Sequence, residues 1–268
     1  MKRLHLFEWE DQRWLPAVFR DFTTDHLHYS IERGKLFDPI VPLLHRALTT
    51  SAETQIVDLC SGGSGPYPGL VRRLEKDFGL RVPVTLTDLF PNQDAIARAE
   101  RESDGLVRYR VEPTSAFDVP GDLAGLRTIF TALHHFRPPD ARRLFADAVA
   151  KRRPIAAFET LDRNVPTMLK IGTFAFLSGI LATHRVGRLT PARAILTYVF
   201  PLAPFFYSWD GMVSCLRTYT PDDLRKITAD LGENYSWEIG QIDARHQFGP
   251  YKITYVIGLP QRVKQQAA

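Results

Sequence analysis

The sequence contains few cysteines and no strong excess of either charge. Its 268 residues include two cysteines, Cys60 and Cys215, which are far apart and match no metal-ligand spacing. This pattern excludes a disulfide framework and favours a reducing compartment. The 34 basic and 30 acidic residues leave too small an excess for a nucleic-acid-binding stripe, so we expect no nucleic-acid partner.

Targeting segments and repeats are also missing from the sequence. Residues 1–14 carry acids and tryptophans but no apolar core segment, so we expect no signal peptide and a cytoplasmic location. We find no internal repeat and no low-complexity segment. A hydrophobic content of 44% is enough for one large α/β domain with additions, without disulfides to stabilise it.

The middle of the sequence alternates short apolar runs with helical patterns. This βαβ rhythm predicts a parallel sheet with helices on both faces, in which ligands bind at the carboxyl ends of the strands. A Gly249-Pro250 turn near the end predicts an antiparallel hairpin. The expected strands are 55–59, 82–87, 106–112, 128–131, 155–159, 236–243 and 251–258. The expected helices of the alternating region are 67–77, 92–100, one near Asp122, and 139–150.

The most informative segment is the turn after the first expected strand, Asp58-Leu59-Cys60-Ser61-Gly62-Gly63-Ser64-Gly65, which is followed one βα unit later by Asp88. Small residues let a ligand approach the backbone closely, and an acid at the next strand tip can accept hydrogen bonds from ribose hydroxyls. The sequence therefore predicts a site for a nucleoside-bearing cofactor. The alternative is an ordinary βα turn in which Asp88 caps a helix.

In this order the elements resemble the class I S-adenosylmethionine-dependent methyltransferases of the small-molecule type. Four family motifs are similar to residues 57–65, 87–90, 115–118 and 128–136. The resemblance implies a Rossmann-like αβα sandwich, with a mostly parallel seven-stranded sheet and a terminal antiparallel strand. It also implies S-adenosylmethionine as the cofactor and S-adenosylhomocysteine as the product.

The resemblance assigns individual roles within these motifs. In the first motif, Cys60 and Ser64 stand where the family usually has glycine, which affects the loop path more than the binding role. Asp88 is implied to contact the ribose, and Asp118 the adenine amino group. The implied cofactor-binding residues are Asp58, Cys60, Ser61, Gly62, Gly63, Ser64, Asp88, Leu89, Phe117, Asp118, Thr131 and Ala132.

His134 and His135 are the candidate catalytic residues, because they follow the fourth expected strand and imidazole titrates near neutral pH. Either can take a proton from an acceptor; the alternative is that they bond to backbone or pack beneath the cofactor. Glu159 can orient an acceptor amine or form a salt bridge. The spacing of His134, Glu159 and Asp162 does not indicate a metal site, so we expect none.

The sequence divides into an N-terminal helical cap (1–50), a cofactor-binding domain (51–161 and 211–260) and an apolar helical insert (162–210). The insert predicts a lid that forms a hydrophobic acceptor pocket with the N-terminal aromatics. It is also compatible with simple core packing, or with docking on a membrane surface. The candidate substrate-binding residues are Trp9, Trp14, Glu159, Tyr207, Trp209 and Arg217.

These patterns together predict methyl transfer from S-adenosylmethionine to a small, rather hydrophobic acceptor. The atom that is methylated and the oligomeric state stay open. A non-catalytic binding module that keeps the fold and docks a partner or a membrane surface is the alternative. A dinucleotide-dependent oxidoreductase fits less well, because the terminal antiparallel hairpin is not part of that fold.

Overall fold

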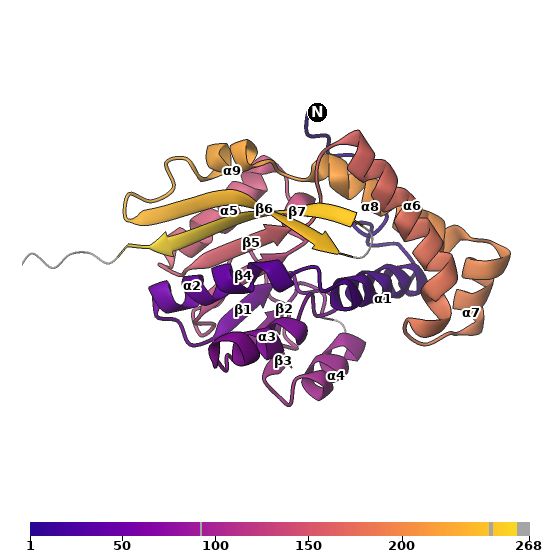
Figure 1. Cartoon of the computed structure of the whole chain (residues 1–268), viewed down its shortest axis with the longest axis horizontal. Helices are drawn as coiled ribbons and strands as arrows, with labels where there is room; N and C mark the ends of the chain where they lie inside the picture. The colour runs from indigo at the N-terminus through magenta and orange to yellow at the C-terminus, as the bar shows by residue number, and fades with distance from the viewer. Residues whose placement is uncertain (92, 247–248, 262–268) are drawn as a thin grey trace, which may run out of the picture.

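A seven-stranded sheet with the order β3-β2-β1-β4-β5-β7-β6 forms the centre of the protein (Figure 1). The computed structural model describes residues 1–91, 93–246 and 249–261. The first five strands run parallel, and β7 pairs antiparallel with both β5 and β6. The strands are β1 (Ile56–Leu59), β2 (Val84–Thr87), β3 (Val107–Tyr109), β4 (Leu126–Phe130), β5 (Ile155–Glu159), β6 (Tyr235–His246) and β7 (Gly249–Pro260).

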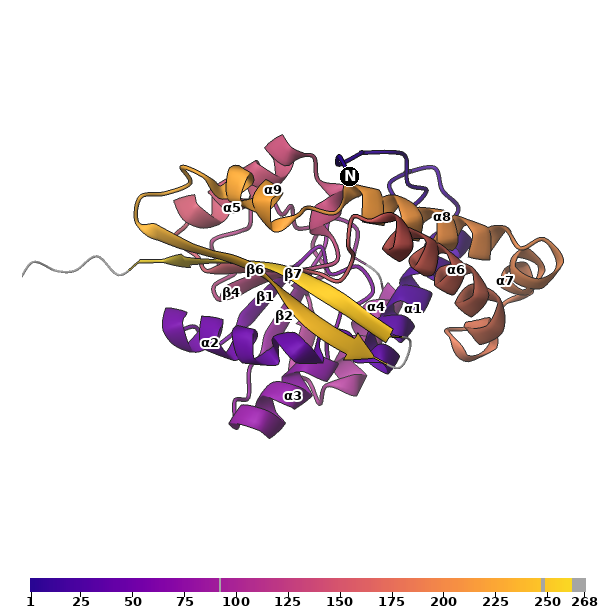
Figure 2. The same cartoon turned by 45° about the horizontal axis from the view of Figure 1, so that its top comes forward.

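Helices cover both faces of the sheet, and a separate group of helices extends beyond one end of it. Figure 2 shows α2 and α3 below the sheet and α5 and α9 above it. The α-helices are α1 (Ala17–Gly34), α2 (Val41–Ser51), α3 (Gly69–Phe78), α4 (Gln93–Glu102), α5 (Pro138–Ala150), α6 (Val165–Ala182), α7 (Pro191–Ala194), α8 (Leu202–Arg217) and α9 (Pro221–Thr228). The short turns are the 3-10 segments η1 (Asp38–Ile40), η2 (Leu133–His135) and η3 (Thr183–Arg185), and the π-helical η4 (Ile195–Val199).

Both faces of the sheet are buried, because successive side chains of each strand point to opposite faces. On β1, Ile56 packs into the core beneath α2 and α3, whereas Val57 packs into the core beneath α5. Strand order reverses between β1 and β4, which leaves their carboxyl ends as the place where a ligand fits between diverging crossovers. The predicted fold class is confirmed.

Two sequence predictions about elements were wrong in detail. The helix expected near Asp122 is a turn, closed by a hydrogen bond from the Leu123 N–H to the Pro120 carbonyl. The strand expected at 106–112 ends at Tyr109. Both segments lie at the β3 edge or in its connection to β4, where few neighbours fix the backbone.

The N-terminal segment also differs from the predicted helical cap. Residues 1–15, which we call the strap, are not helical and lie against α8; the Leu4 N–H donates to the Leu216 carbonyl at 3.0 Å. α2 belongs to the core of the sheet, since Leu44 and Leu48 are fully buried there. Of the predicted cap, α1 and the strap are therefore the parts that lie at the carboxyl end of the strands.

The insert forms an antiparallel pair of helices, α6 and α8, joined through η3, α7 and η4. Glycine allows the close approach: a Cβ at Gly172 would lie 2.7 Å from Met212, and one at Gly179 would lie 3.1 Å from Pro204. α8 continues to Arg217, so the expected boundary at residue 210 falls within a helix. Figures 1 and 2 show this pair projecting from the sheet beside α1.

Candidate cofactor and active site

The small-residue loop after β1 has an unusual backbone conformation. Three alternate residues have positive φ, namely Cys60 (58°), Gly62 (48°) and Ser64 (89°). L-residues rarely adopt this conformation, and such strain concentrates at functional sites. A Cβ at Gly62 would meet no atom within 4 Å, so the loop presents its backbone to open space there. This is the cradle that a closely approaching ligand requires.

Hydrogen bonds fix the loop to the end of β2. The Ser61 N–H donates to the Thr87 carbonyl at 3.0 Å, and the Gly62 N–H donates to Asp88 Oδ2 at 2.9 Å. The Thr87 hydroxyl returns a bond to the Asp58 carbonyl at 2.8 Å. The two predicted motif segments are thus one connected structure at the carboxyl edge of the sheet.

Asp58 is the buried acid of this structure. Its Oδ1 accepts a hydrogen bond from the Thr128 hydroxyl at 2.6 Å, and its Oδ2 accepts one from the Ser61 hydroxyl at 2.7 Å. Burial raises the pKa of Asp58 to about 7, although these hydrogen bonds favour the ionised form. The carboxyl can therefore change charge near neutral pH.

Asp88 lies at the tip of β2, with its Oδ2 bonded to the loop and its Oδ1 bonded to the turn that follows it. Besides the bond from Gly62, its Oδ1 accepts the Phe90 N–H at 2.9 Å. Burial raises the pKa of Asp88, while these backbone bonds partly offset the shift. α4 begins only at Gln93, so the alternative role of Asp88 as the cap of that helix does not apply. The neighbouring Leu89 is 49% exposed.

The third motif begins at the site but leaves it. The Thr114 N–H donates to the Asp88 carbonyl at 2.8 Å, which places the start of this segment beside the loop. Asp118 is 84% exposed and pairs with Lys151 Nζ at 2.6 Å, at the far end of α5. In the structure the Asp118 carboxylate thus forms a surface ion pair, and its contact with the adenine amino group stays a prediction. Phe117 packs edge-on against Phe136, with ring centroids 5.3 Å apart.

His134 is held by Glu159 at the tips of β4 and β5. Its backbone N–H donates to Glu159 Oε1 at 3.1 Å, and its Nδ1 lies 2.9 Å from Glu159 Oε2. Both side chains are buried. A proton on Nδ1 directed at the carboxylate leaves Nε2 with its lone pair, which is the tautomer that a general base requires. Thr131, with φ of 48°, and Ala132 form the turn into this pair.

His135 belongs to a cluster of opposite charges that joins the strap to the site. Its Nδ1 lies 3.1 Å from Glu8 Oε2 and 3.0 Å from Asp11 Oδ1. Arg217 Nη1 lies 2.9 Å from Glu8 and 2.6 Å from Asp11. Burial lowers the pKa of His135, but the hydrogen bonds and charges of Asp11 and Glu8 raise it well above its usual value. This imidazolium is a poor proton acceptor at neutral pH.

Within the described residues, three side chains lie close enough together to hold a metal ion, but hydrogen bonds and ion pairs already engage them. Ligand atoms of Glu8, His134 and His135 come within 4.8 Å of one another. Glu8 Oε1 already accepts the Ser214 hydroxyl at 3.0 Å, and its other oxygen is shared by Arg217 and His135. A dication there would face the Arg217 guanidinium, so the geometry favours ion pairing over coordination.

The predicted substrate-binding residues divide into two groups. Trp9 stacks on Phe206 of α8 with centroids 4.1 Å apart, and Trp14 meets Trp9 edge-on at 6.1 Å. Trp9 is the chain neighbour of Glu8, whose Oε2 lies 3.1 Å from His135 Nδ1. Tyr207, in contrast, is buried beside His26 of α1, and the centroids of the two rings lie 5.7 Å apart.

Trp209 and Arg217 hold the strap instead of facing an acceptor. The Trp209 indole N–H donates to the Phe7 carbonyl at 2.9 Å. Arg217 is 2% exposed and donates to the Leu6 carbonyl as well as to the two acids. These donors are engaged by the strap, and the direct contact of Trp209 and Arg217 with an acceptor stays a prediction.

Two residues near the loop were not predicted from the sequence. His28 of α1 has its Nδ1 3.3 Å from the Gly65 carbonyl, and the Tyr109 hydroxyl donates to the Gly62 carbonyl at 3.2 Å. Nothing in the pattern around His28 indicates this role, because α1 precedes the first strand by many residues. Tyr109 ends β3, whereas the expected strand continued to residue 112, so the sequence did not place Tyr109 at the carboxyl edge.

No protein-family model matches the sequence, and no curated protein is similar to it. The comparison with solved structures does find similar folds. A protein from Rhodobacter sphaeroides, provisionally described as a zinc-dependent alcohol dehydrogenase, is 15% identical with a TM-score of 0.50, over 91% of this chain and 98% of that one. Magnesium protoporphyrin IX methyltransferase from Synechocystis is 11% identical with a TM-score of 0.43, over 83% of each chain. A bacterial Hen1 methyltransferase domain is 12% identical with a TM-score of 0.46, over 82% and 98%.

The strand order decides between the folds that bind nucleoside cofactors. The dinucleotide-binding order is 3-2-1-4-5-6, whereas here the antiparallel β7 is inserted between β5 and β6. The chain has the fold of the class I S-adenosylmethionine-dependent methyltransferases. In this class I fold, the loop 60–65 and Asp88 occupy the places of the first two motifs. A structural similarity at such low sequence identity shows the fold alone, so the activity has to be inferred from the residues of the site.

Proposed function

We propose that the protein transfers a methyl group from S-adenosylmethionine to a small acceptor. The observation that carries this proposal is the joined pair of motifs: the positive-φ loop after β1, bonded through Gly62 to Asp88 at the tip of β2. The loop offers backbone at close range and Asp88 offers carboxylate lone pairs suited to ribose hydroxyls. These donors and acceptors fit the nucleoside half of the cofactor.

Bound S-adenosylmethionine supplies an electrophilic methyl group, so the chain itself needs only to hold, orient and desolvate the two reactants. Asp88 and the loop hold the nucleoside. The ionised carboxylate of Asp58 favours a cation nearby, as the cofactor's methionine ammonium would be. The strap lies against the turn after β4 through the pairs of Glu8 and Asp11 with His135, where it would shield the reactants from water.

His134 is the residue that we assign as proton acceptor. Glu159 fixes its ring through Nδ1 at 2.9 Å, which directs the basic Nε2 away from that carboxylate. His135 has the supporting role, as a cation that keeps Glu8 and Asp11 in place. The nearby stack of Trp9 on Phe206 supports an acceptor with an apolar, flat surface. The free cysteines Cys60 and Cys215 support the cytoplasm as its compartment.

Calorimetry on the full chain tests the proposal. We expect S-adenosylhomocysteine to bind and to raise the melting temperature, and NADH to do neither. Binding of NADH alone would favour the oxidoreductase alternative. Binding of neither would favour a module that keeps the fold without the chemistry.

A further inference from the structure

The insert ends in a surface that is strongly apolar. We define the insert tip as residues 177–205, which include the end of α6, the turns η3 and η4, α7 and the start of α8. Several large side chains of the tip are exposed to solvent, among them Leu181 (68%), Val199 (63%), Phe200 (61%), Leu177 (50%) and Phe205 (50%). Soluble proteins rarely leave so many large apolar residues together on one element.

α6 places its small residues inside and its large residues outside. Gly172, Ala175 and Gly179 are buried against α8, whereas Leu169, Leu177 and Leu181 face solvent. The segment Val165–Arg185 has a mean hydropathy of 1.5, yet only 17% of its apolar window is buried. This is the reverse of an amphipathic helix in water, and it resembles helices that face lipid.

Inside the two ends of the insert, all charged side chains are basic. From Arg163 to Trp209, both included, the sequence has no aspartate or glutamate but five lysines and arginines. Arg185 and Arg188 are exposed at the tip, and Arg193 is buried in an ion pair with Asp25 of α1 at 2.8 Å. Exposed apolar side chains flanked by cations match an anionic lipid surface in both hydrophobicity and charge.

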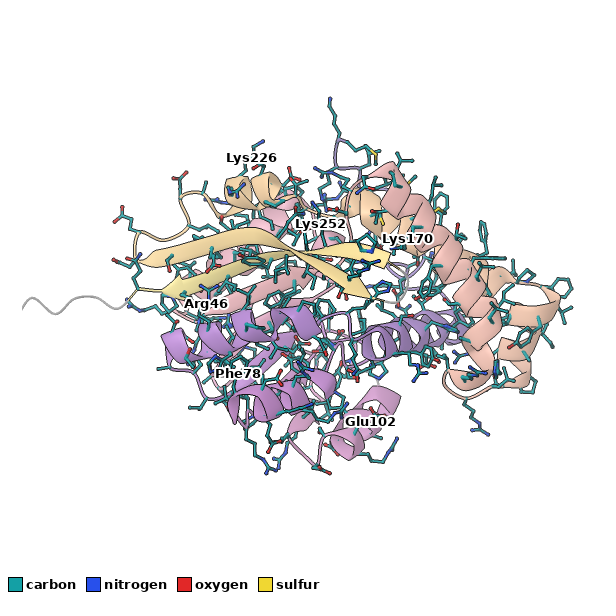
Figure 3. The ribbon with its side chains drawn as sticks, viewed as in Figure 1. Arg46, Phe78, Glu102, Lys170, Lys226 and Lys252 are labelled. Atoms are coloured by element: carbon teal, nitrogen blue, oxygen red, sulfur yellow. The ribbon has the colours of Figure 1, made fainter. Side chains whose placement is uncertain are left out.

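We propose that the insert tip docks on the surface of an anionic lipid bilayer. The tip lies in the interface, and the helix pair does not span the membrane, because both of its ends return to the sheet. α6 follows β5 directly, α8 leads into α9, and Lys170 donates to the Pro250 carbonyl of β7 at 3.2 Å (Figure 3). This inference stands apart from the proposed methyl transfer, since it uses none of the residues of that site.

Vesicle flotation with the full chain tests the proposal. We expect the protein to float with vesicles of phosphatidylcholine mixed with phosphatidylglycerol, and at least several-fold less with phosphatidylcholine alone. Arg185→Glu combined with Arg188→Glu should reduce the bound fraction roughly tenfold or more, since each cation near an anionic surface strengthens binding about fivefold. Val199→Asp combined with Phe200→Asp should reduce it by a similar factor, because charges would enter the lipid interface.

Matched controls lie on other surfaces. Lys226→Glu on α9 (Figure 3) and Val111→Asp, at a site that is 57% exposed, should bind vesicles as the parent does. Circular dichroism melting checks that every variant is folded. The proposal is overturned if the folded parent stays at the bottom of the gradient, or if tip and control variants float equally. A dimer in sedimentation velocity that Val199→Asp with Phe200→Asp dissociates, without vesicle binding, would assign the tip to a second copy instead.

Discussion

Asp58 is the residue whose charge should couple cofactor binding to pH. Burial raises its pKa to about 7, so the empty site holds a mixture of protonated and ionised carboxyl at neutral pH. A ligand with a cationic amino group favours the ionised form. We expect the affinity for S-adenosylhomocysteine to rise roughly tenfold between about pH 6 and about pH 8. Calorimetry of the parent and of Asp58→Asn measures this; the prediction fails if the two have the same pH dependence.

The contribution of Asp58 to folding stability changes with pH in the opposite direction to its contribution to cofactor binding. Because the folded-state pKa of Asp58 lies above its unfolded value of about 4, the folded protein holds the proton more tightly. The contribution of Asp58 to stability is therefore most favourable below about pH 4 and declines as the pH rises to about 7. A buried, partly charged acid at the loop is consistent with a site that a cationic ligand completes.

The pKa values of two histidines should be shifted in opposite directions. The carboxylates of Asp11 and Glu8 raise the pKa of His135 well above its usual value despite its burial. Burial and the charge of Arg193 lower the pKa of His26 to about 4. In an NMR titration of the imidazole C2 protons, we expect one signal to stay protonated beyond about pH 7 and another to stay neutral to about pH 5. Assignment through His135→Gln and His26→Gln identifies each signal, and two ordinary titrations near pH 6.5 would contradict the geometry.

For single residues, the sequence indicated which polar side chains lie at the carboxyl edge of the sheet when those side chains come at the ends of strands. Asp58, Asp88, His134 and Glu159 all follow or end short apolar runs, and parallel strands bring such residues to one edge. The place of Asp118 was harder to predict, because its segment has no strand to fix it and its carboxylate pairs with the surface residue Lys151.

Among the elements, the strap is the one that depends most on buried charge. Glu8 is fully buried, and Arg217 is 2% exposed. Arg217→Met would leave the buried Glu8 without its guanidinium partner, and we expect the free energy of unfolding to fall by about 3 kcal/mol. Urea denaturation measures the change. Arg225→Met serves as the control, since its pair with Asp222 is exposed and should change stability by less than about 0.5 kcal/mol. Equal effects of the two substitutions would show that the strap is not held by this cluster.

The strap should be most stable in a window of pH. Burial raises the pKa values of Glu8 and Asp11, but bonds and charges from His135 and Arg217 bring both below their usual values. Their contribution is present above the unfolded values near pH 4 and is lost as the pH falls through the lowered values. The contribution of His135 is present below about pH 6.5 and is lost as the pH rises through its raised pKa.

The strap shows why some elements escaped prediction. Residues 1–15 have aromatic and charged residues that suggest a helix, yet several of their polar groups bond to α8, more than 190 residues later in the chain. Asp210, for example, accepts the N–H groups of Trp9 and Glu10 at 2.8 and 3.0 Å. A local pattern cannot report contacts with a distant partner, whereas the sheet strands carry their own alternation and turn residues.

The molecule as a whole brings three parts to one end of the sheet. The strand tips provide the loop, Asp88 and the His134–Glu159 pair; the strap provides the buried acids; and α8 provides Arg217, which joins the strap to the body. The insert tip projects from this same end (Figure 2). An acceptor dissolved in a lipid interface would therefore meet the protein on the side where the candidate site lies.

Calorimetry with S-adenosylhomocysteine on Asp88→Ala tests the central claim most directly, which is that the tips of β1 and β2 hold a nucleoside cofactor. The account predicts that the parent binds and that Asp88→Ala binds roughly tenfold to a hundredfold more weakly, as expected for lost hydrogen bonds to a charged acceptor. Asp243→Ala, at a carboxylate that is 90% exposed on β6, should bind as the parent does. Equal affinity of Asp88→Ala and the parent, or no binding by the parent, would contradict the account.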